Sequence, residues 1–201
     1  MIHLPVEYFE RIYAAGDDPW GFDSRWYEAR KYAMTLAALP HQRYARAFEP
    51  GCANGAFTTQ LATRCEALIA SELVPAVAAR ARARVAELPH VEIRTQAIPE
   101  HWPEGSFDLI VLSEVLYFLT AHGLTTVLRR IDDCLAFGGH VISVNWTGST
   151  DAPLSGEEVH RALDSHPGLD RIGHYREPSF VLSVYERAVV RRKVVPVKAE
   201  P

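Results

Sequence analysis

The stretch Glu49-Pro-Gly-Cys-Ala-Asn-Gly55 follows a short apolar run, residues 44–48, and precedes a helical pattern at residues 57–65. A strand, a glycine-containing turn and a helix in that order are typical of a ligand site at the carboxyl edge of a parallel sheet. Glycine lets a ligand approach the backbone, and the first turn of the following helix presents free N–H groups. This stretch therefore indicates both the fold class and the position of a binding site.

The rest of the chain continues the alternation of strands and helices. Further apolar strands are predicted at residues 67–71, 91–95, 107–112 and 140–146, with helices at 74–88 and 123–136, the latter closed by Gly138-Gly139. Beyond Pro153 the pattern predicts a helix at 155–165 and two strands, 169–175 and 180–186, which can form a hairpin. Continuous apolar strands alternating with helices predict an α/β fold, in which helices cover both faces of a parallel sheet.

Composition narrows the function classes. The chain has 201 residues, 48% hydrophobic and 23% charged, which is typical of one soluble globular domain. A net charge of −4 disfavours nucleic acid as a partner, and no apolar run approaches the ~20 residues that span a membrane. Three cysteines, Cys52, Cys65 and Cys134, fit no metal motif, and no histidine pair has metal-ligand spacing. We therefore expect a cytoplasmic protein without a metal that acts on a small molecule.

Residues 1–40 differ from the rest of the chain because they are rich in aromatic side chains. A helix is expected from Tyr27 to Leu36, leading toward the sheet, and the segment before it is too aromatic for a disordered tail. We expect a single domain with a helical aromatic lid at 1–40, a core at 41–187 and a loosely ordered tail at 188–201. Trp20, Trp26 and Tyr27 either only pack this lid or also stack on a sugar.

The residues themselves indicate a nucleoside cofactor. Glu72 ends the second strand about 20 residues after Gly51, where an acid accepts hydrogen bonds from ribose hydroxyls. The turn is G-x-x-x-G, without the dinucleotide fingerprint or a phosphate-binding lysine. Glu49 repels a pyrophosphate and attracts an ammonium group. S-adenosylmethionine (SAM), which carries an ammonium, a sulfonium and a ribose, meets these requirements.

Several stretches resemble known methyltransferase motifs. The turn with Glu49 and Glu72, then Phe107-Asp-Leu-Ile110 and Leu135-Ala-Phe-Gly-Gly-His140, resemble those of class I SAM-dependent methyltransferases, over residues 45–146. The resemblance implies a seven-stranded, mostly parallel Rossmann-like sheet with an antiparallel last strand. One departure is Ala53, where the usual motif has a third glycine; a methyl group is tolerated there if φ is negative.

A narrower resemblance involves the N-terminal segment and the end of the fourth strand. The chain is similar there to the NodS-like group of N-methyltransferases, which act on a free amino sugar at the end of a chitooligosaccharide. The stretches that carry this similarity are Tyr8-Phe-Glu-Arg11, Asp18-Pro-Trp20, Trp26-Tyr-Glu28, Arg30-Lys-Tyr32 and Ser113-Glu-Val-Leu-Tyr-Phe118.

The expected site residues follow from these positions. Cofactor contacts are expected at the strand ends and the glycine turn, in the loop that cups adenine, and in the lid, where Arg30 meets the cofactor carboxylate; they are Glu49, Gly51, Cys52, Ala53, Gly55, Glu72, Leu73, Ala97, Ile98, Ser113, Arg30 and Trp20. Glu114 is expected near the methyl group, where it orients an amine and accepts its proton. Tyr117, three residues further, is expected near the sulfonium, although a place in the core is the open alternative.

Three functions fit this pattern. The first is methylation of a small-molecule amine, with an amino sugar as the leading acceptor. The second is O-methylation of a natural-product hydroxyl, which requires a histidine or lysine base that the sequence does not place. The third is a non-catalytic SAM-binding partner protein, which the intact set of Glu49, Gly51, Gly55 and Glu72 disfavours.

Overall fold

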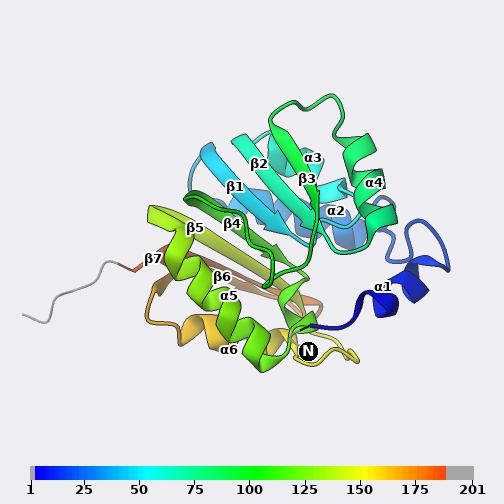
Figure 1. Ribbon diagram of the computed structural model, residues 1–201. Helices are drawn as coiled ribbons and strands as arrows, with labels where there is room; N and C mark the ends of the chain where they lie inside the picture. Colours follow the sequence, from blue (N-terminus) through cyan, green and yellow to red (C-terminus); the bar gives the residue numbers. More distant parts are fainter. Residues whose placement is uncertain (1–2, 189–201) are drawn as a thin grey trace, which may run out of the picture.

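The chain folds around one seven-stranded sheet, described by a computed structural model that covers residues 3–188 (Figure 1). The strand order is β3-β2-β1-β4-β5-β7-β6. The strands β1 to β5 pair in parallel, whereas β7 is antiparallel to both β5 and β6. The predicted mostly parallel sheet with an antiparallel last strand is thus confirmed. The strand bounds are β1 (Tyr44–Pro50), β2 (Cys65–Glu72), β3 (Val91–Thr95), β4 (Phe107–Ser113), β5 (Leu135–Trp146), β6 (Leu169–Arg176) and β7 (Phe180–Arg187).

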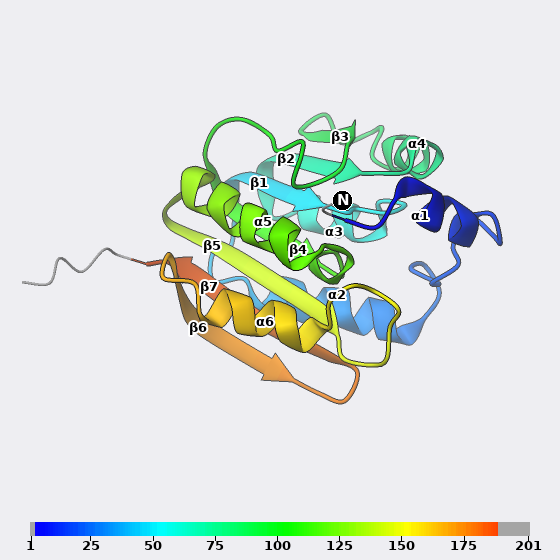
Figure 2. The ribbon, with the colours of Figure 1, turned by 60° about the horizontal axis from the view of Figure 1, so that its bottom comes forward.

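Helices cover both faces of the sheet, as Figures 1 and 2 show. One face carries α2 (Trp26–Ala38), α3 (Ala56–Ala62) and α4 (Pro75–Arg84), and the other carries α5 (Ala121–Cys134) and α6 (Gly156–Asp164). Central strand β4 serves both layers, because Leu109 and Val111 pack with α2 and α3 while Ile110 and Leu112 pack with α5 and α6. A strand buried on both faces reads as a continuous apolar run, which is why the sequence predicted it well.

Several predicted boundaries are wrong. The helix predicted at 57–65 ends at Ala62, and Cys65 already begins β2. The helix before β5 ends at Cys134, and Gly138-Gly139 lie inside β5 instead of closing that helix. The start of β5 is irregular: Leu135 pairs with Phe107, the register then shifts, and His140 pairs with Leu109. Helix α4 likewise ends at Arg84 instead of extending to residue 88. The expected tail from residue 189 onward lies outside the described residues.

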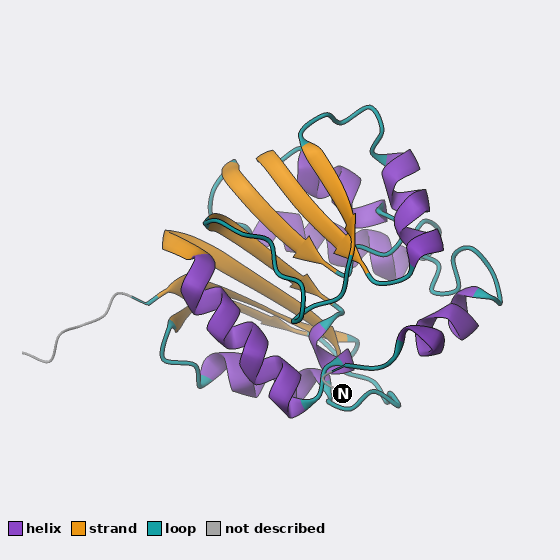
Figure 3. Cartoon of the chain, in the orientation of Figure 1, coloured by secondary structure: helices purple, strands orange, loops and turns teal. Residues whose placement is uncertain are grey.

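The N-terminal segment lies at the carboxyl edge of the parallel strands, where the arrowheads point toward helix α1 (Val6–Tyr13) (Figure 3). The backbone N–H of Leu4 donates to the carbonyl oxygen of Phe118 in the short 3₁₀ helix η1 (Leu116–Phe118), at 3.0 Å. The Tyr8 hydroxyl donates to Asp151 at 2.7 Å, and the rings of Phe9 and Phe118 are 5.0 Å apart. These contacts place α1 across the edge where the sequence predicted a ligand.

No helix in residues 3–188 has the length and apolar character needed to cross a membrane.

Candidate active site

A cavity of about 950 Å³ opens at the carboxyl ends of β1, β2 and β4, beneath α1 and beside α2. Its wall contains all of the predicted site residues except Gly55 and Arg30; those present are Trp20, Glu49, Gly51, Cys52, Ala53, Glu72, Leu73, Ala97, Ile98, Ser113, Glu114 and Tyr117. Within the described part of the chain, no group of three or more histidine, cysteine or acidic side chains is arranged to hold a metal ion. The cavity therefore suits an organic ligand with polar and apolar parts.

The glycine turn is fixed to β2. The N–H groups of Gly51 and Cys52 donate to the carbonyl of Ser71 at 2.7 and 2.9 Å. Gly51 has a φ of +73°, and a Cβ added there would lie 2.8 Å from Cγ2 of Val115. Glycine at this position is thus required by the turn and by a protein neighbour, and Gly51 also lines the cavity, so that its contact with a cofactor stays a prediction.

The second glycine has a structural role as well. Gly55 is the N-cap residue of α3, with a φ of +81°, and an added Cβ would lie 3.2 Å from the Cα of Ala81 on α4. It is absent from the cavity wall. Gly55 therefore lets α3 start close to α4 and does not line the cavity.

Ala53 departs from its expected conformation, because its φ is +48° instead of negative. Its N–H donates to Oε2 of Glu72 at 3.1 Å, and this bond holds the turn against β2. A left-handed conformation costs a residue with a Cβ roughly 1–2 kcal/mol. The turn therefore carries local strain directly beside the cavity.

Glu72 fits the ribose position. Its Oε1 accepts the N–H of Val74 at 2.8 Å, and its Oε2 accepts that of Ala53 at 3.1 Å. Burial raises the pKa of the Glu72 carboxyl, and the surrounding backbone N–H groups oppose that rise. The backbone N–H of Leu73 also acts on this carboxylate. Because a carboxylate has about four lone-pair sites, Glu72 keeps room for a donor from a ligand hydroxyl group.

Glu49 fits a cationic group. Only 3% of its surface is exposed, and burial raises the pKa of its carboxyl to about 8, with the Thr58 hydroxyl opposing the rise. Its Oε2 has no hydrogen-bond partner among the residues that the structure describes. A buried carboxyl oxygen without a partner is costly, and an ammonium group in the cavity would supply one.

Two other predicted contacts frame the same end of the cavity. Ala97 and Ile98 follow β3 and line the wall beyond Glu72, where the sequence expected the adenine loop. Trp20 lines the wall from the N-terminal segment, with its ring edge-on to Tyr13 at 5.1 Å. Burial raises the pKa of the Cys52 thiol, which favours a packing role over a nucleophilic one.

Arg30 is directed away from the cavity. It pairs with Glu177, donates to the Tyr175 hydroxyl at 3.0 Å and lies over the ring of Phe180. The arginine that lines the wall is Arg25, the N-cap residue of α2, whose side chain packs against Gly21. The expectation that Arg30 meets the cofactor is thus corrected, because its partners lie on the β6–β7 hairpin.

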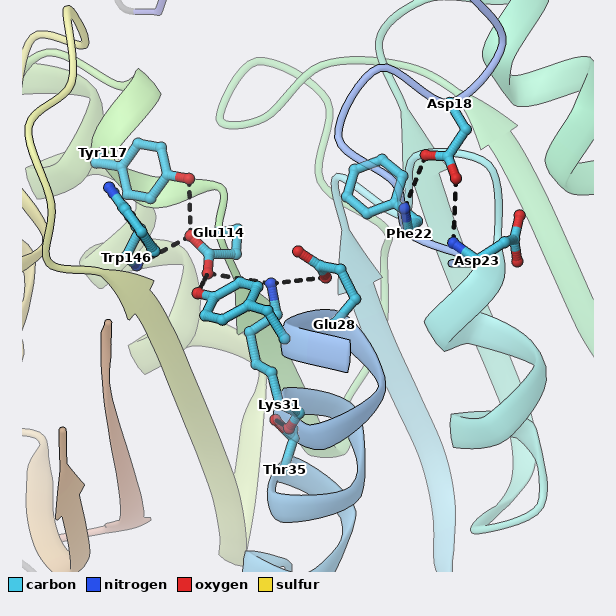
Figure 4. A network of polar contacts seen from close by, with 10 residues as sticks. Asp18, Phe22, Asp23, Glu28, Lys31, Thr35, Glu114, Tyr117 and Trp146 are labelled. Carbon is cyan, nitrogen blue, oxygen red and sulfur yellow. Dashed lines mark hydrogen bonds and ion pairs between the residues drawn. The ribbon is translucent and has the colours of Figure 1, made fainter. Parts of the chain in front are cut away.

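Glu114 is the centre of a polar network at the other end of the cavity (Figure 4). Its Oε1 accepts hydrogen bonds from the Tyr27 hydroxyl at 3.0 Å and Lys31 Nζ at 3.1 Å. Its Oε2 accepts from the Tyr117 hydroxyl at 2.7 Å and the backbone N–H of Trp146 at 2.9 Å. The backbone of Glu114 has a φ of +56°, so the network holds a strained residue.

Lys31 connects this network to α2. Only 2% of its surface is exposed, and its Nζ lies 2.9 Å from Oε2 of Glu28 as well as beside Glu114. It also lies 4.9 Å from the centre of the Tyr27 ring. A buried ammonium between two carboxylates satisfies the rule that buried charges are paired.

The sequence interpretation placed α2 but missed that its side chains Glu28 and Lys31 reach the site. Glu28, Lys31 and Thr35 are buried on one face of the helix, at spacings of three and four residues. Charged residues at the buried positions of a helix are unusual unless they are paired. This spacing was a readable signal for an internal Glu–Lys pair, whereas its partner Glu114 comes from a distant part of the chain.

Comparison with known proteins identifies relatives of the chain. Residues 7–147 match the family Nodulation protein S (NodS). Nodulation protein S of Rhizobium tropici is 36% identical over 130 residues, which cover 64% of this chain and 55% of the relative. That of Bradyrhizobium diazoefficiens is 40% identical over 106 residues, covering 52% of this chain and 51% of the relative. The chain thus matches little more than half the length of these curated relatives.

A solved structure gives the fold comparison. The N-methyltransferase NodS from Bradyrhizobium japonicum WM9, in complex with S-adenosyl-L-homocysteine (SAH), is 26% identical. It superposes with a TM-score of 0.81, over 90% of this chain and 97% of that chain.

Proposed function

The chain belongs to the NodS family, and from this premise and the cavity we propose that it transfers a methyl group from SAM to an amine of a small molecule. The leading acceptor is an amino sugar. The observation that carries the proposal is the buried Glu49 carboxyl, one oxygen of which has no hydrogen-bond partner within residues 3–188, in the same cavity wall as Glu72.

The cavity wall fits each part of SAM. Glu49 matches its ammonium and Glu72 its ribose hydroxyls, because they end the neighbouring strands β1 and β2. Arg25 offers the planar fork that binds a carboxylate, and Ala97 and Ile98 cover the adenine. This arrangement sets the reactive end of the cofactor toward β4, where Glu114 and Tyr117 lie.

The chemistry needs alignment more than covalent help. When bound, SAM supplies a methyl carbon that the amine lone pair attacks, while the electron pair of the broken C–S bond stays on sulfur. The protein holds the two reactants in line and excludes water beneath α1, and both effects lower the barrier. The amine must arrive neutral, and after transfer its nitrogen gives one proton to water.

An amine is favoured over a hydroxyl by the basic side chains of the wall. A hydroxyl acceptor needs a base to remove its proton. Lys31 is held between Glu28 and Glu114 as an ammonium, which has no lone pair, and losing a proton to become a base would break both ion pairs. His3 lies on the N-terminal segment, 3.2 Å from Glu100. Neither side chain is placed as a base for an alcohol.

The acceptor end of the wall supports a sugar. Trp146 lines it with its ring edge-on to Tyr27, at 5.5 Å. Polar side chains of the loop after β5 and of the β6–β7 turn lie in the same wall; they are Ser149, Thr150, Asp151 and Ser179. Hydroxyl and carboxyl groups around an aromatic ring suit a ligand that carries many hydroxyls.

A methyl-donor assay tests this function. The purified chain is incubated with SAM and a panel of alkyl amines, amino sugars and phenols, and the products are identified by mass spectrometry. We expect methylation of amines, with amino sugars best. Methylation of phenols alone would move O-methylation to first place, and SAH binding without turnover of any acceptor would support a non-catalytic role.

A further inference from the structure

The Glu114 carboxylate has no unused hydrogen-bonding position within its network. A carboxylate offers about four lone-pair sites. Tyr27, Lys31, Tyr117 and the backbone N–H of Trp146 occupy them, two donors on each oxygen. A substrate amine reaches Glu114 only by displacing one of these donors, which would leave a partly buried donor unpaired.

The two tyrosine hydroxyls are therefore oriented by Glu114. A phenol has one hydrogen to donate, and both Tyr27 and Tyr117 direct it at the carboxylate. Burial, and next the charge of Glu114, raise the pKa of each phenol, so that neither loses this hydrogen near neutral pH. Each phenol oxygen therefore offers only lone pairs to other groups, and both side chains line the cavity.

From this geometry, and on the basis of the proposed methyl transfer, we propose that Glu114 is a positioning residue. It fixes the hydroxyl rotors of Tyr27 and Tyr117 so that their oxygens present only acceptors to the substrate nitrogen. The tyrosines touch the amine, and Glu114 acts through them and does not take the proton of the amine itself.

Lys31 supports the arrangement from α2. Its ammonium donates to the same oxygen, Oε1, as Tyr27 and is itself paired with Glu28. The carboxylate is thus held from α2, from η1 and from the end of β5 together. A group fixed from three elements has little freedom to swing toward a substrate.

Acceptor-only oxygens select for an amine. A neutral primary amine donates N–H to a phenol oxygen and keeps its lone pair for the methyl carbon. As the N–C bond forms and the C–S electron pair goes to sulfur, the nitrogen becomes positive and its N–H bonds to the phenol oxygens strengthen. A hydroxyl can donate its single hydrogen in the same way, but it finds no base that removes the proton.

The first test is Glu114→Gln, assayed with the best amine acceptor and compared with Glu92→Gln. Glu92 is an exposed glutamate paired with Arg94 far from the wall, and it serves as the matched control. In this variant an NH₂ group replaces one of the two acceptor oxygens. It faces the two groups that donated to that oxygen, one of which is a phenol, so this phenol turns its hydrogen into the cavity. We expect kcat/KM for the amine to fall about 10- to 100-fold, as for loss of charge-assisted hydrogen bonds, with the SAH dissociation constant unchanged.

The decisive test is the double-mutant cycle. Tyr27→Phe and Tyr117→Phe should each lower kcat/KM in the wild-type background. At least one of them should have a much smaller effect in Glu114→Gln, because the hydroxyl that faces the amide NH₂ already lacks its orientation. The pH profile of kcat/KM should follow the pKa of the substrate amine in both backgrounds. If the losses in kcat/KM are additive, or if the rise of kcat/KM with pH disappears in Glu114→Gln, Glu114 is instead a general base.

Failure of this proposal is distinguishable from failure of the proposed function. The melting temperature of Glu114→Gln shows whether this variant folds. If it folds poorly, Tyr27→Phe and Tyr117→Phe still test the proposal, because full activity of both variants would overturn the positioning role. Full activity of Glu114→Gln does so as well. If the wild-type chain binds no SAH and methylates no amine, the proposed function itself is wrong.

Discussion

Gly51, Ala53 and Glu114 share a positive φ, and all three border the cavity. A residue with a Cβ pays for this conformation, so the strain persists only where surrounding contacts fix it. At Ala53 the fixing contact is the N–H bond to Glu72, and at Glu114 it is the four-donor network. Strain at the residue scale thus coincides with the two ends of the proposed site.

The strain at Ala53 gives a stability prediction. Ala53→Gly should leave the free energy of unfolding unchanged or raise it by up to about 1 kcal/mol, because relief of the left-handed Cβ offsets the extra freedom of the unfolded chain. The matched control is Ala79→Gly, at an exposed position inside α4, which should lower the free energy of unfolding by about 1 kcal/mol. Urea denaturation measures both; an equal loss in the two variants would contradict a strained Ala53.

Glu49 makes the ligand-free protein sensitive to pH. The pKa of its carboxyl is about 8 in the folded chain, above the ordinary value, so the folded state holds a proton that the unfolded state has released. Between the ordinary glutamate value and about pH 8, this group therefore lowers stability as the pH rises. An ammonium ligand reverses the effect, because it favours the ionised carboxylate.

Cofactor binding should consequently release a proton from Glu49 at pH 7. Calorimetry of SAH binding in two buffers with different ionisation enthalpies measures this release directly. Glu49→Gln should abolish it, and so should methylthioadenosine, which keeps the ribose and lacks the ammonium. Proton release that persists in Glu49→Gln would assign it to another acid, with Glu72 the first candidate.

At the scale of elements, sequence patterns located β3 and β4 to within one residue, because their apolar runs are bounded by turns. They failed at Gly138-Gly139, since a glycine pair signals a helix end equally well as an irregular strand start. They also failed to join α2 to Glu114, because Lys31 and Glu114 lie 83 residues apart in the chain. Local patterns predict elements, whereas pairings between distant side chains depend on packing.

Helix α1 should open more readily than any element of the sheet. None of its residues is fully buried, and it is held mainly by the Tyr8–Asp151 hydrogen bond and the contact between Phe9 and Phe118. An element with few buried contacts opens locally without global unfolding. It has the position and the weak attachment of a lid that opens for ligand exchange.

Phe9→Ala tests this attachment. Amide hydrogen exchange at residues 3–13 should become faster, with little change in the melting temperature of the sheet, and SAH should restore part of the protection. Phe137→Ala removes a ring that is 80% exposed and serves as the control. Exchange at residues 3–13 that is equally fast in both variants would show that α1 is not held by Phe9.

At the scale of the whole molecule, the sheet explains why one cavity gathers residues from distant parts of the chain. Parallel strands end at the same edge, so Glu49, Glu72 and Ser113 are neighbours there although they are distant in sequence. This much follows from the order of elements, which is why the meeting of these strand ends could be predicted from the sequence. The acceptor end is assembled from α2, η1 and the end of β5, and no single stretch of sequence encodes it.

The most direct measurement uses one acceptor that carries both an amine and hydroxyls. A 2-amino sugar is incubated with the chain and SAM labelled with ¹³C in its methyl group, in parallel with its N-acetyl counterpart, and the product is analysed by mass spectrometry and carbon NMR. We predict an N-methyl signal from the amino sugar and no product from the N-acetyl sugar, because the hydroxyls they share find no base in the cavity. An O-methyl signal, or equal methylation of both sugars, would contradict amine methylation as the function of this site.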